Sequence, residues 1–143
     1  MNNKKLNKIK IFLPVVFFSY SLFATAYIDY PLSYVVESCK IIQKRLNPKQ
    51  ASEDDFLMAR NKYKTCMNFI MSLSTTLNQR CISIKNEMIT PSNNITYADL
   101  SDVNSTKEII NEVIKYSERN PQFINQIAWL HASKAISKRW PCK

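Results

Sequence analysis

The side chains of this chain that are suited to acid–base catalysis are one histidine and a short run of carboxylates. His131 is the sole histidine, and it falls on the apolar face of a helical pattern, where a histidine is far more often packed than catalytic. Glu53, Asp54 and Asp55 stand together at the start of another helical segment, where negative charge stabilises the helix end. Packing explains the histidine and capping explains the carboxylates, so we expect no catalytic residue and no enzymatic activity.

The four cysteines are suited to a metal site, to thiol chemistry or to disulfides. A zinc site is disfavoured because the sequence has no C-x2-4-C pair and only one histidine. A reactive Cys–His pair is disfavoured because an even number of cysteines in an exported chain favours disulfides. We therefore expect two disulfides, no metal site and no cofactor.

Export is indicated by the first 26 residues, which have the three features of a secretory signal peptide. These are a basic start, an apolar run and a small-residue cleavage site, at Lys4 to Lys10, residues 11–23 and Ala24-Thr25-Ala26. The apolar run is too short to span a bilayer. We expect residues 1–26 to be removed and residues 27–143, the mature chain, to form a single domain in the periplasm, without membrane association.

The net charge of the whole chain is +9, and removal of the four lysines of the signal peptide leaves +5 on the mature chain. Outside the cytosol this charge indicates an acidic partner or plain solubility, not nucleic acid. Glycine is absent, which excludes phosphate-binding loops, dinucleotide fingerprints, calcium loops and nucleophile elbows. Asparagine is then expected to supply left-handed helix ends, and the candidates are Asn47, Asn78, Asn93 and Asn94.

Apolar residues at helical spacing predict an all-α fold with four main helices, over residues 31–46, 52–79, 105–119 and 121–140. Capping boxes at Ser52 and Ser105 begin the second and third helices, and Asn120-Pro121 restarts the chain for the last. The predicted inward faces include Phe56, Tyr63 and Cys66 on the second helix and Ile124, Ile127 and His131 on the last.

Four cysteines allow three connectivities, and helical position favours one of them. Cys39 and Cys66 each lie in the middle of the inward face of neighbouring antiparallel helices, where a bridge forms without distortion. Cys81 and Cys142 each lie just past the end of a predicted helix. The favoured pairing is therefore Cys39–Cys66 and Cys81–Cys142, which fixes two chain ends to each other.

Residues 82–104 form an unusually long connection between the second and third predicted helices. A turn-forming cluster occupies residues 91–94, and Thr96 with Asp99 predicts one short additional helix that ends at Val103. Such a connection is either a plain surface loop or a functional segment. As a functional segment it would bind a partner protein, with Asn93, Asn94 and Tyr97 as the contact residues.

The mature chain resembles the Rap/Tai family of periplasmic immunity proteins, which protect bacteria from type VI secretion amidases. The resembling motifs are Cys39, Cys66-Met-Asn68-Phe69-Ile70-Met-Ser72, Cys81-Ile-Ser83, Tyr116 with Asn120-Pro121, and the closing run Ala128, His131, Ala135, Ile136 and Trp140-Pro141-Cys142. Asn68 and Ser72 stand where the family has glycines, and the family's proline after the third cysteine is missing. The terminal segment is the most specific part of the match.

The resemblance implies a helical, often dimeric protein that inhibits a cell-wall amidase effector by occupying its substrate cleft. Our expectation from sequence is therefore a periplasmic immunity protein that blocks a type VI secretion peptidoglycan amidase. Two alternatives stay open: a non-enzymatic, chaperone-like interaction module in the periplasm or outside the cell, and an exported effector that acts on a host.

Overall fold

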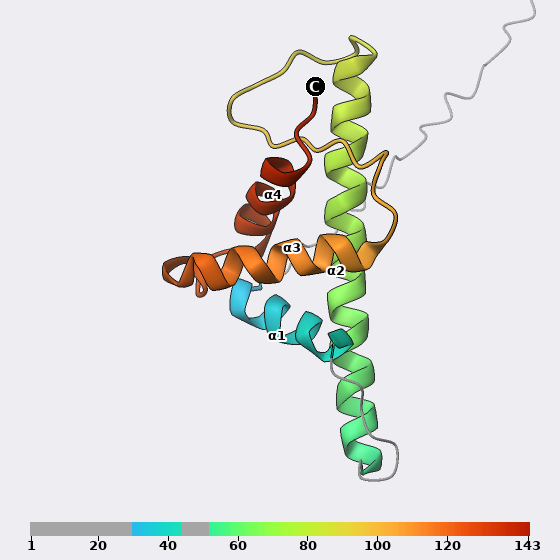
Figure 1. Ribbon diagram of the computed structural model, residues 1–143, viewed down its shortest axis with the longest axis vertical. Coiled ribbons are helices and arrows are strands. Elements are labelled where there is room, and N and C mark those ends of the chain that lie inside the picture. The colour runs from blue at the N-terminus through green and yellow to red at the C-terminus, as the bar shows by residue number, and fades with distance from the viewer. Residues whose placement is uncertain (1–29, 44–51) are drawn as a thin grey trace, which may run out of the picture.

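The computed structural model describes residues 30–43 and 52–143, and the predicted all-α class is confirmed there (Figure 1). In chain order the elements are α1 (Leu32–Gln43), α2 (Glu53–Lys85), α3 (Thr106–Arg119), the 3-10 turn η1 (Pro121–Phe123) and α4 (Ala128–Arg139). The predicted signal peptide and Asn47 lie outside the described residues.

Helix α2 forms the long axis of the molecule, α1 and α3 cross it at steep angles, and α4 stands to one side of it (Figure 1). At 33 residues α2 is about 50 Å long, which is longer than the other three helices can cover. The core between them is a cluster of fully or almost fully buried aliphatic residues, among them Leu32, Val35, Ile70, Leu73, Leu77, Ile110, Val113 and Ile136. The disulfide Cys39–Cys66 lies within this cluster and joins α1 to α2, as predicted.

The start of α2 follows the predicted capping box. The Ser52 hydroxyl accepts a hydrogen bond from the Asp55 backbone N–H at 3.2 Å, and the Asp55 carboxylate accepts one from the Ser52 N–H at 3.0 Å. The Ser52 hydroxyl also donates to the Asp55 carboxylate at 2.7 Å, and this bond, followed by the one from the Ser52 N–H, lowers the pKa of Asp55. At Ser105 the prediction is wrong, because its side chain makes no capping bond to the α3 backbone.

Helix α2 ends six residues later than predicted, at Lys85. No glycine or proline interrupts residues 80–85, and the apolar spacing continues from Leu77 to Cys81, which is fully buried. Cys81 therefore lies inside the helix and not after its end. The helix closes in a Schellman motif, in which the Met88 N–H donates to the Ser83 carbonyl and the Glu87 N–H donates to the Ile84 carbonyl.

The left-handed position of this motif is held by Glu87, with φ of 57°. Asparagine was expected in this role. Among the described residues, however, Glu87 is the one residue with positive φ, so the expectation is wrong for Asn78, Asn93 and Asn94. A left-handed conformation costs a residue with a Cβ atom about 1–2 kcal/mol, which glycine avoids.

Replacing Glu87 by glycine is therefore expected to raise the free energy of unfolding by about 0.5–1 kcal/mol, after allowance for the greater freedom that glycine gives the unfolded chain. Urea denaturation measures this change. Glu87→Ala is the matched control, because it removes the carboxylate but keeps the Cβ atom, and it should leave stability nearly unchanged. Equal effects of the two variants would contradict the conformational explanation.

The predicted last helix, residues 121–140, is divided in the structure into η1, an irregular turn and α4. The cause is a contact with the start of α1, where the Leu32 and Ser33 N–H groups donate to the carbonyls of Gln126 and Ile124, at 2.8 and 2.7 Å. An isolated bridge pairs Pro31 with Ile127. The first N–H groups of a helix have no partner within it, so this contact satisfies α1 and holds residues 124–127 out of a helix.

The predicted inward faces are wrong at three residues. Phe56, Tyr63 and Ile127 have exposed fractions of 44%, 48% and 48%. Phe56 and Tyr63 lie near the start of α2 and line an open groove with Ile41 and Ile42 of α1, so α1 covers them only in part. Ile127 lies in the turn that pairs with Pro31, so helical periodicity does not set its direction.

Candidate functional site

His131 lies where α3, η1 and α4 meet, and it is almost fully buried, as predicted. Its ring stacks on Phe123 with the ring centroids 4.4 Å apart. Its Nε2 is 2.8 Å from the Gln126 Oε1 atom, and its Nδ1 is 3.4 Å from the Tyr116 hydroxyl. Both nitrogens thus have neutral partners, an arrangement that fits an imidazole with its proton on Nε2.

Burial lowers the pKa of His131, and the positive charge of Lys134 lowers it further. The folded protein thus binds this proton less readily than the unfolded chain does. The contribution of His131 to stability is complete above its ordinary pKa of 6.5 and is lost as the pH falls through the folded-state pKa.

We expect the free energy of unfolding to fall from about pH 7.5 to about pH 5, a range in which unperturbed carboxyl groups stay ionised. Urea denaturation across this range measures the slope. His131→Gln is expected to be less stable by about 1–3 kcal/mol at neutral pH and to have a flatter pH profile. Parallel profiles for the two proteins would show that another group causes the dependence.

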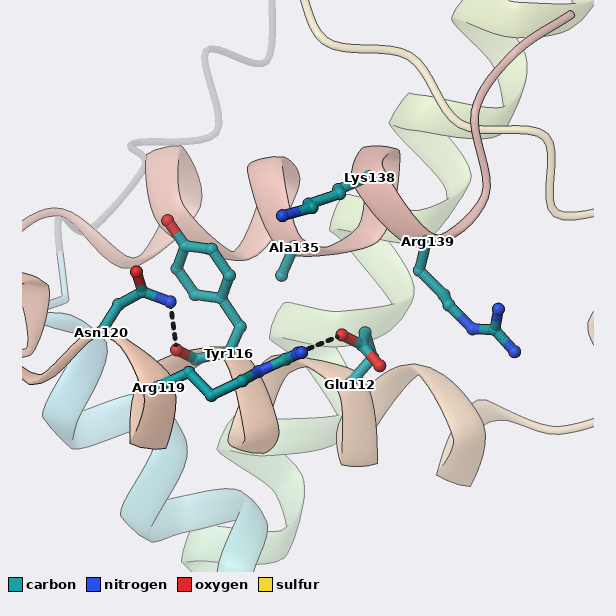
Figure 2. Close-up of a pocket in the computed structure, with 7 residues that line it drawn as sticks. All are labelled: Glu112, Tyr116, Arg119, Asn120, Ala135, Lys138 and Arg139. Carbon is teal, nitrogen blue, oxygen red and sulfur yellow. Dashed lines mark hydrogen bonds and ion pairs between the residues drawn. The ribbon is translucent and has the colours of Figure 1, made fainter.

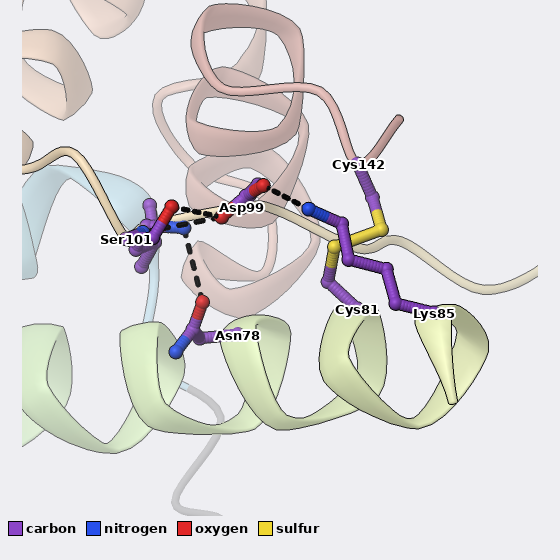
Figure 3. Close-up of a disulfide and its surroundings, with 7 residues drawn as sticks. Asn78, Cys81, Lys85, Asp99, Ser101 and Cys142 are labelled. Carbon is purple, nitrogen blue, oxygen red and sulfur yellow. Dashed lines mark hydrogen bonds and ion pairs between the residues drawn. A yellow bond between two sulfur atoms is a disulfide. The ribbon is translucent and has the colours of Figure 1, made fainter. Parts of the chain in front are cut away.

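The second disulfide, Cys81–Cys142, joins the last turns of α2 to the C-terminal segment, and the predicted pairing is confirmed (Figure 3). No cysteine is free among the described residues. Two disulfides indicate an oxidising, exported environment.

Within the described part of the chain, no group of His, Cys, Asp or Glu side chains could hold a metal ion. None of the described helices has both the length and the apolar character of a membrane span.

Beside this disulfide, the returning half of loop 86–105 is fixed to α2 and to the C-terminal segment. The Ala98 N–H donates to the Leu77 carbonyl, the Asp99 N–H to the Trp140 carbonyl, and the Leu100 N–H to the Asn78 Oδ1 atom, at 3.3, 3.1 and 3.0 Å. These N–H groups are therefore not used within a helix, and the predicted short helix from Thr96 to Val103 is wrong.

An ion pair between Lys85 and Asp99 also joins the end of α2 to the loop (Figure 3). Asp99 accepts two further hydrogen bonds from Ser101, through its N–H at 3.2 Å and its hydroxyl at 2.7 Å. Lys85, and then Ser101, lower the pKa of Asp99 to about 2. The Asp99 carboxylate is consequently ionised throughout the neutral and mildly acidic range.

The other half of the loop, residues 88–95, is the tip. Asn93 and Asn94 are exposed there, where the sequence analysis placed partner contacts. Tyr97 is half-buried, and its hydroxyl accepts a hydrogen bond from the Ser92 N–H at 2.6 Å and donates one to the Ser92 carbonyl at 3.1 Å. The Tyr97 hydroxyl therefore closes the turn that presents the two asparagines.

The tip also exposes three large apolar side chains that are not among the predicted contact residues. Met88, Ile89 and Ile95 have exposed fractions of 64%, 41% and 43%. Their signal in the sequence is that apolar residues flank a turn-forming cluster and have no helical or strand period. Residues 88–98 contain no charged side chain, in a chain with 22% charged residues. Loop 86–105 thus has a base that is bonded to α2 and to the C-terminal segment, and a tip that is uncharged and partly apolar.

Comparisons of the chain with family models, curated proteins and solved structures find no match.

Proposed function

We propose that this protein is a periplasmic immunity protein that binds and inhibits a type VI secretion peptidoglycan amidase. The observation that carries the proposal is the loop 86–105, whose base is bonded to α2 and to the C-terminal segment and whose tip is exposed. A loop that is ordered before binding loses less conformational entropy when it binds.

The chemistry of the tip supports a protein partner. The centre of a protein interface is depleted of charge and enriched in apolar side chains, and a few polar groups fix its orientation. The tip combines Ile89, Ile95 and Met88 with the amides of Asn93 and Asn94, and it carries no charge. Such a segment suits a cleft that accepts the peptide part of peptidoglycan, because that substrate also presents amides and small apolar groups. In this proposal the tip enters the substrate cleft of the amidase and excludes the cell wall.

Bacterial growth tests the proposal. The full chain, with its first 26 residues, is co-expressed with periplasmically directed type VI amidases, those encoded beside its gene first. Rescue of growth by the wild-type protein, and loss of rescue by the tip variant Ile89→Ser/Asn93→Ala/Ile95→Ser, is the expected result. Met71→Ser is the matched control because Met71 is an exposed apolar residue of α2 outside the loop. Failure to rescue growth from any of these amidases would contradict the proposal.

A second candidate function is a chaperone-like module, which the first turns of α2 favour. Phe56, Leu57, Met58 and Tyr63 are all exposed there, and exposed apolar patches often bind other proteins. This function predicts that the purified protein suppresses aggregation of a reduced, unfolding client and that Leu57→Ser/Met58→Ser abolishes the effect. The immunity function predicts no such suppression.

A further inference from the structure

Helices α3 and α4 pack against each other and leave a groove of about 460 Å³ between them, to which no residue of loop 86–105 contributes (Figure 2). The residues that line it lie between positions 112 and 120 and between positions 135 and 139, and are Glu112, Tyr116, Arg119, Asn120, Ala135, Lys138 and Arg139. Ala135 is buried between the two helices, and its small side chain leaves the space above it open.

The charges of this groove do not balance. Arg119, Lys138 and Arg139 are cationic, whereas Glu112 is the one carboxylate among the lining residues. That carboxylate forms an ion pair with Arg119, since its Oε1 atom lies 2.7 Å from a terminal nitrogen of the guanidinium group. No ion pair joins Lys138 or Arg139 to a carboxylate among the residues that the structure describes. The groove consequently has an excess of positive charge next to polar groups of Tyr116 and Asn120.

A simpler explanation is that basic residues in the last turn of α4 stabilise the negative end of the helix dipole. A contribution to the helix dipole is compatible with a second role for Lys138. Its side chain extends back over Ala135 towards Tyr116, away from the C-terminal end of α4 (Figure 2). Its ammonium group is therefore placed over the groove, where it can donate hydrogen bonds to an anionic ligand.

We propose that this groove docks an acidic segment of the partner protein, through aspartate or glutamate side chains that contact Lys138 and Arg139. The expected charge of +5 on the mature chain would attract such a partner at long range, and the groove would fix its orientation. The inference adds a second contact to the proposed function and rests on it only for the identity of the partner.

The probe is a capped hexaglutamate peptide, titrated at low salt into the ¹⁵N-labelled mature protein and followed by NMR. We expect shift changes concentrated at residues 112–120 and 135–139, and affinity at least about tenfold weaker in Lys138→Glu/Arg139→Glu. The matched control is Lys64→Glu/Lys107→Glu, which reverses two exposed lysines elsewhere and should change affinity less than about twofold. Circular dichroism melts check that both variants fold.

Chemical-shift changes scattered over all basic residues, or an equal loss of affinity in the two variants, would show that the groove is not a specific binding site. Tighter binding of a heparin oligosaccharide than of hexaglutamate at the same residues would show that the ligand is not an acidic protein segment. The outcome is independent of amidase inhibition. Specific binding of hexaglutamate without rescue of growth would contradict only the proposed immunity function. Rescue of growth without binding of hexaglutamate would contradict only the proposed docking groove.

Discussion

Replacement of Cys39 and Cys66 together by alanine is expected to lower the free energy of unfolding by at least about 3.5 kcal/mol. The bond closes a loop between residues 27 positions apart, and loss of that constraint gives the unfolded chain the corresponding entropy. Both cysteines are also fully buried within the core cluster, so removal of the sulfur atoms leaves a cavity between α1 and α2. Urea denaturation of the mature protein measures the change.

The control for this first prediction is the wild-type protein with both disulfides reduced, which should be less stable than the alanine variant because it loses two constraints. The alternative is that the helices pack well enough without the bridge. A denaturation midpoint for Cys39→Ala/Cys66→Ala that equals the wild-type midpoint would establish that alternative.

Replacement of Cys81 and Cys142 by alanine is expected to lower the free energy of unfolding by about 4 kcal/mol, because these residues are 61 positions apart and close a longer loop. A local effect should accompany the global one. The bridge holds the C-terminal segment beside α2, and the Trp140 carbonyl of that segment accepts the Asp99 N–H of the loop. Hydrogen exchange should therefore accelerate first in the loop and in residues 139–143.

The two disulfide variants control for each other. Cys39→Ala/Cys66→Ala should leave relative protection in loop 86–105 unchanged, whereas Cys81→Ala/Cys142→Ala should also weaken binding of the proposed amidase partner. If the second variant keeps full protection in the loop, the disulfide is not part of its anchor.

The sequence predicted the type of each main helix because apolar spacing and capping residues are local signals. Ser52 with Asp55 begins α2 as expected. The predicted disulfide pairing is correct because Cys39 lies on the inward face of α1 and Cys66 lies on the inward face of α2. Cys81 was placed after α2 instead of within it. The pairing survives this error because the inward face of α2 continues from Leu77 to Cys81.

Two of the errors, the undivided last helix and the short helix in the loop, share one physical cause, which is a hydrogen bond from a backbone N–H to a residue far away in the sequence. The start of α1 bonds to residues 124–126 and breaks the predicted last helix, and residues 98–100 bond to α2 and to Trp140 in place of a short helix. A local pattern contains no information on such partners. Glu87 is a different case, because the absence of glycine predicted a left-handed residue with a Cβ atom, but the predicted type was asparagine and the residue found is glutamate.

The candidate site was predicted in part. The long connection and the exposed positions of Asn93 and Asn94 follow from turn chemistry. The bond from Tyr97 to Ser92 and the exposure of Met88, Ile89 and Ile95 depend on how the loop folds back on α2, which the sequence does not specify.

We propose that this protein acts by presenting a fixed surface and not by making or breaking bonds. The most direct measurement is peptidoglycan hydrolysis by purified type VI amidases, titrated with the mature protein and with the tip variant Ile89→Ser/Asn93→Ala/Ile95→Ser. We predict that the wild-type protein abolishes hydrolysis by one of these amidases at equimolar ratio, and that the tip variant, with an unchanged melting temperature, is about 100-fold weaker. Full amidase activity in excess wild-type protein, or hydrolysis of peptidoglycan by this protein alone, would contradict the account.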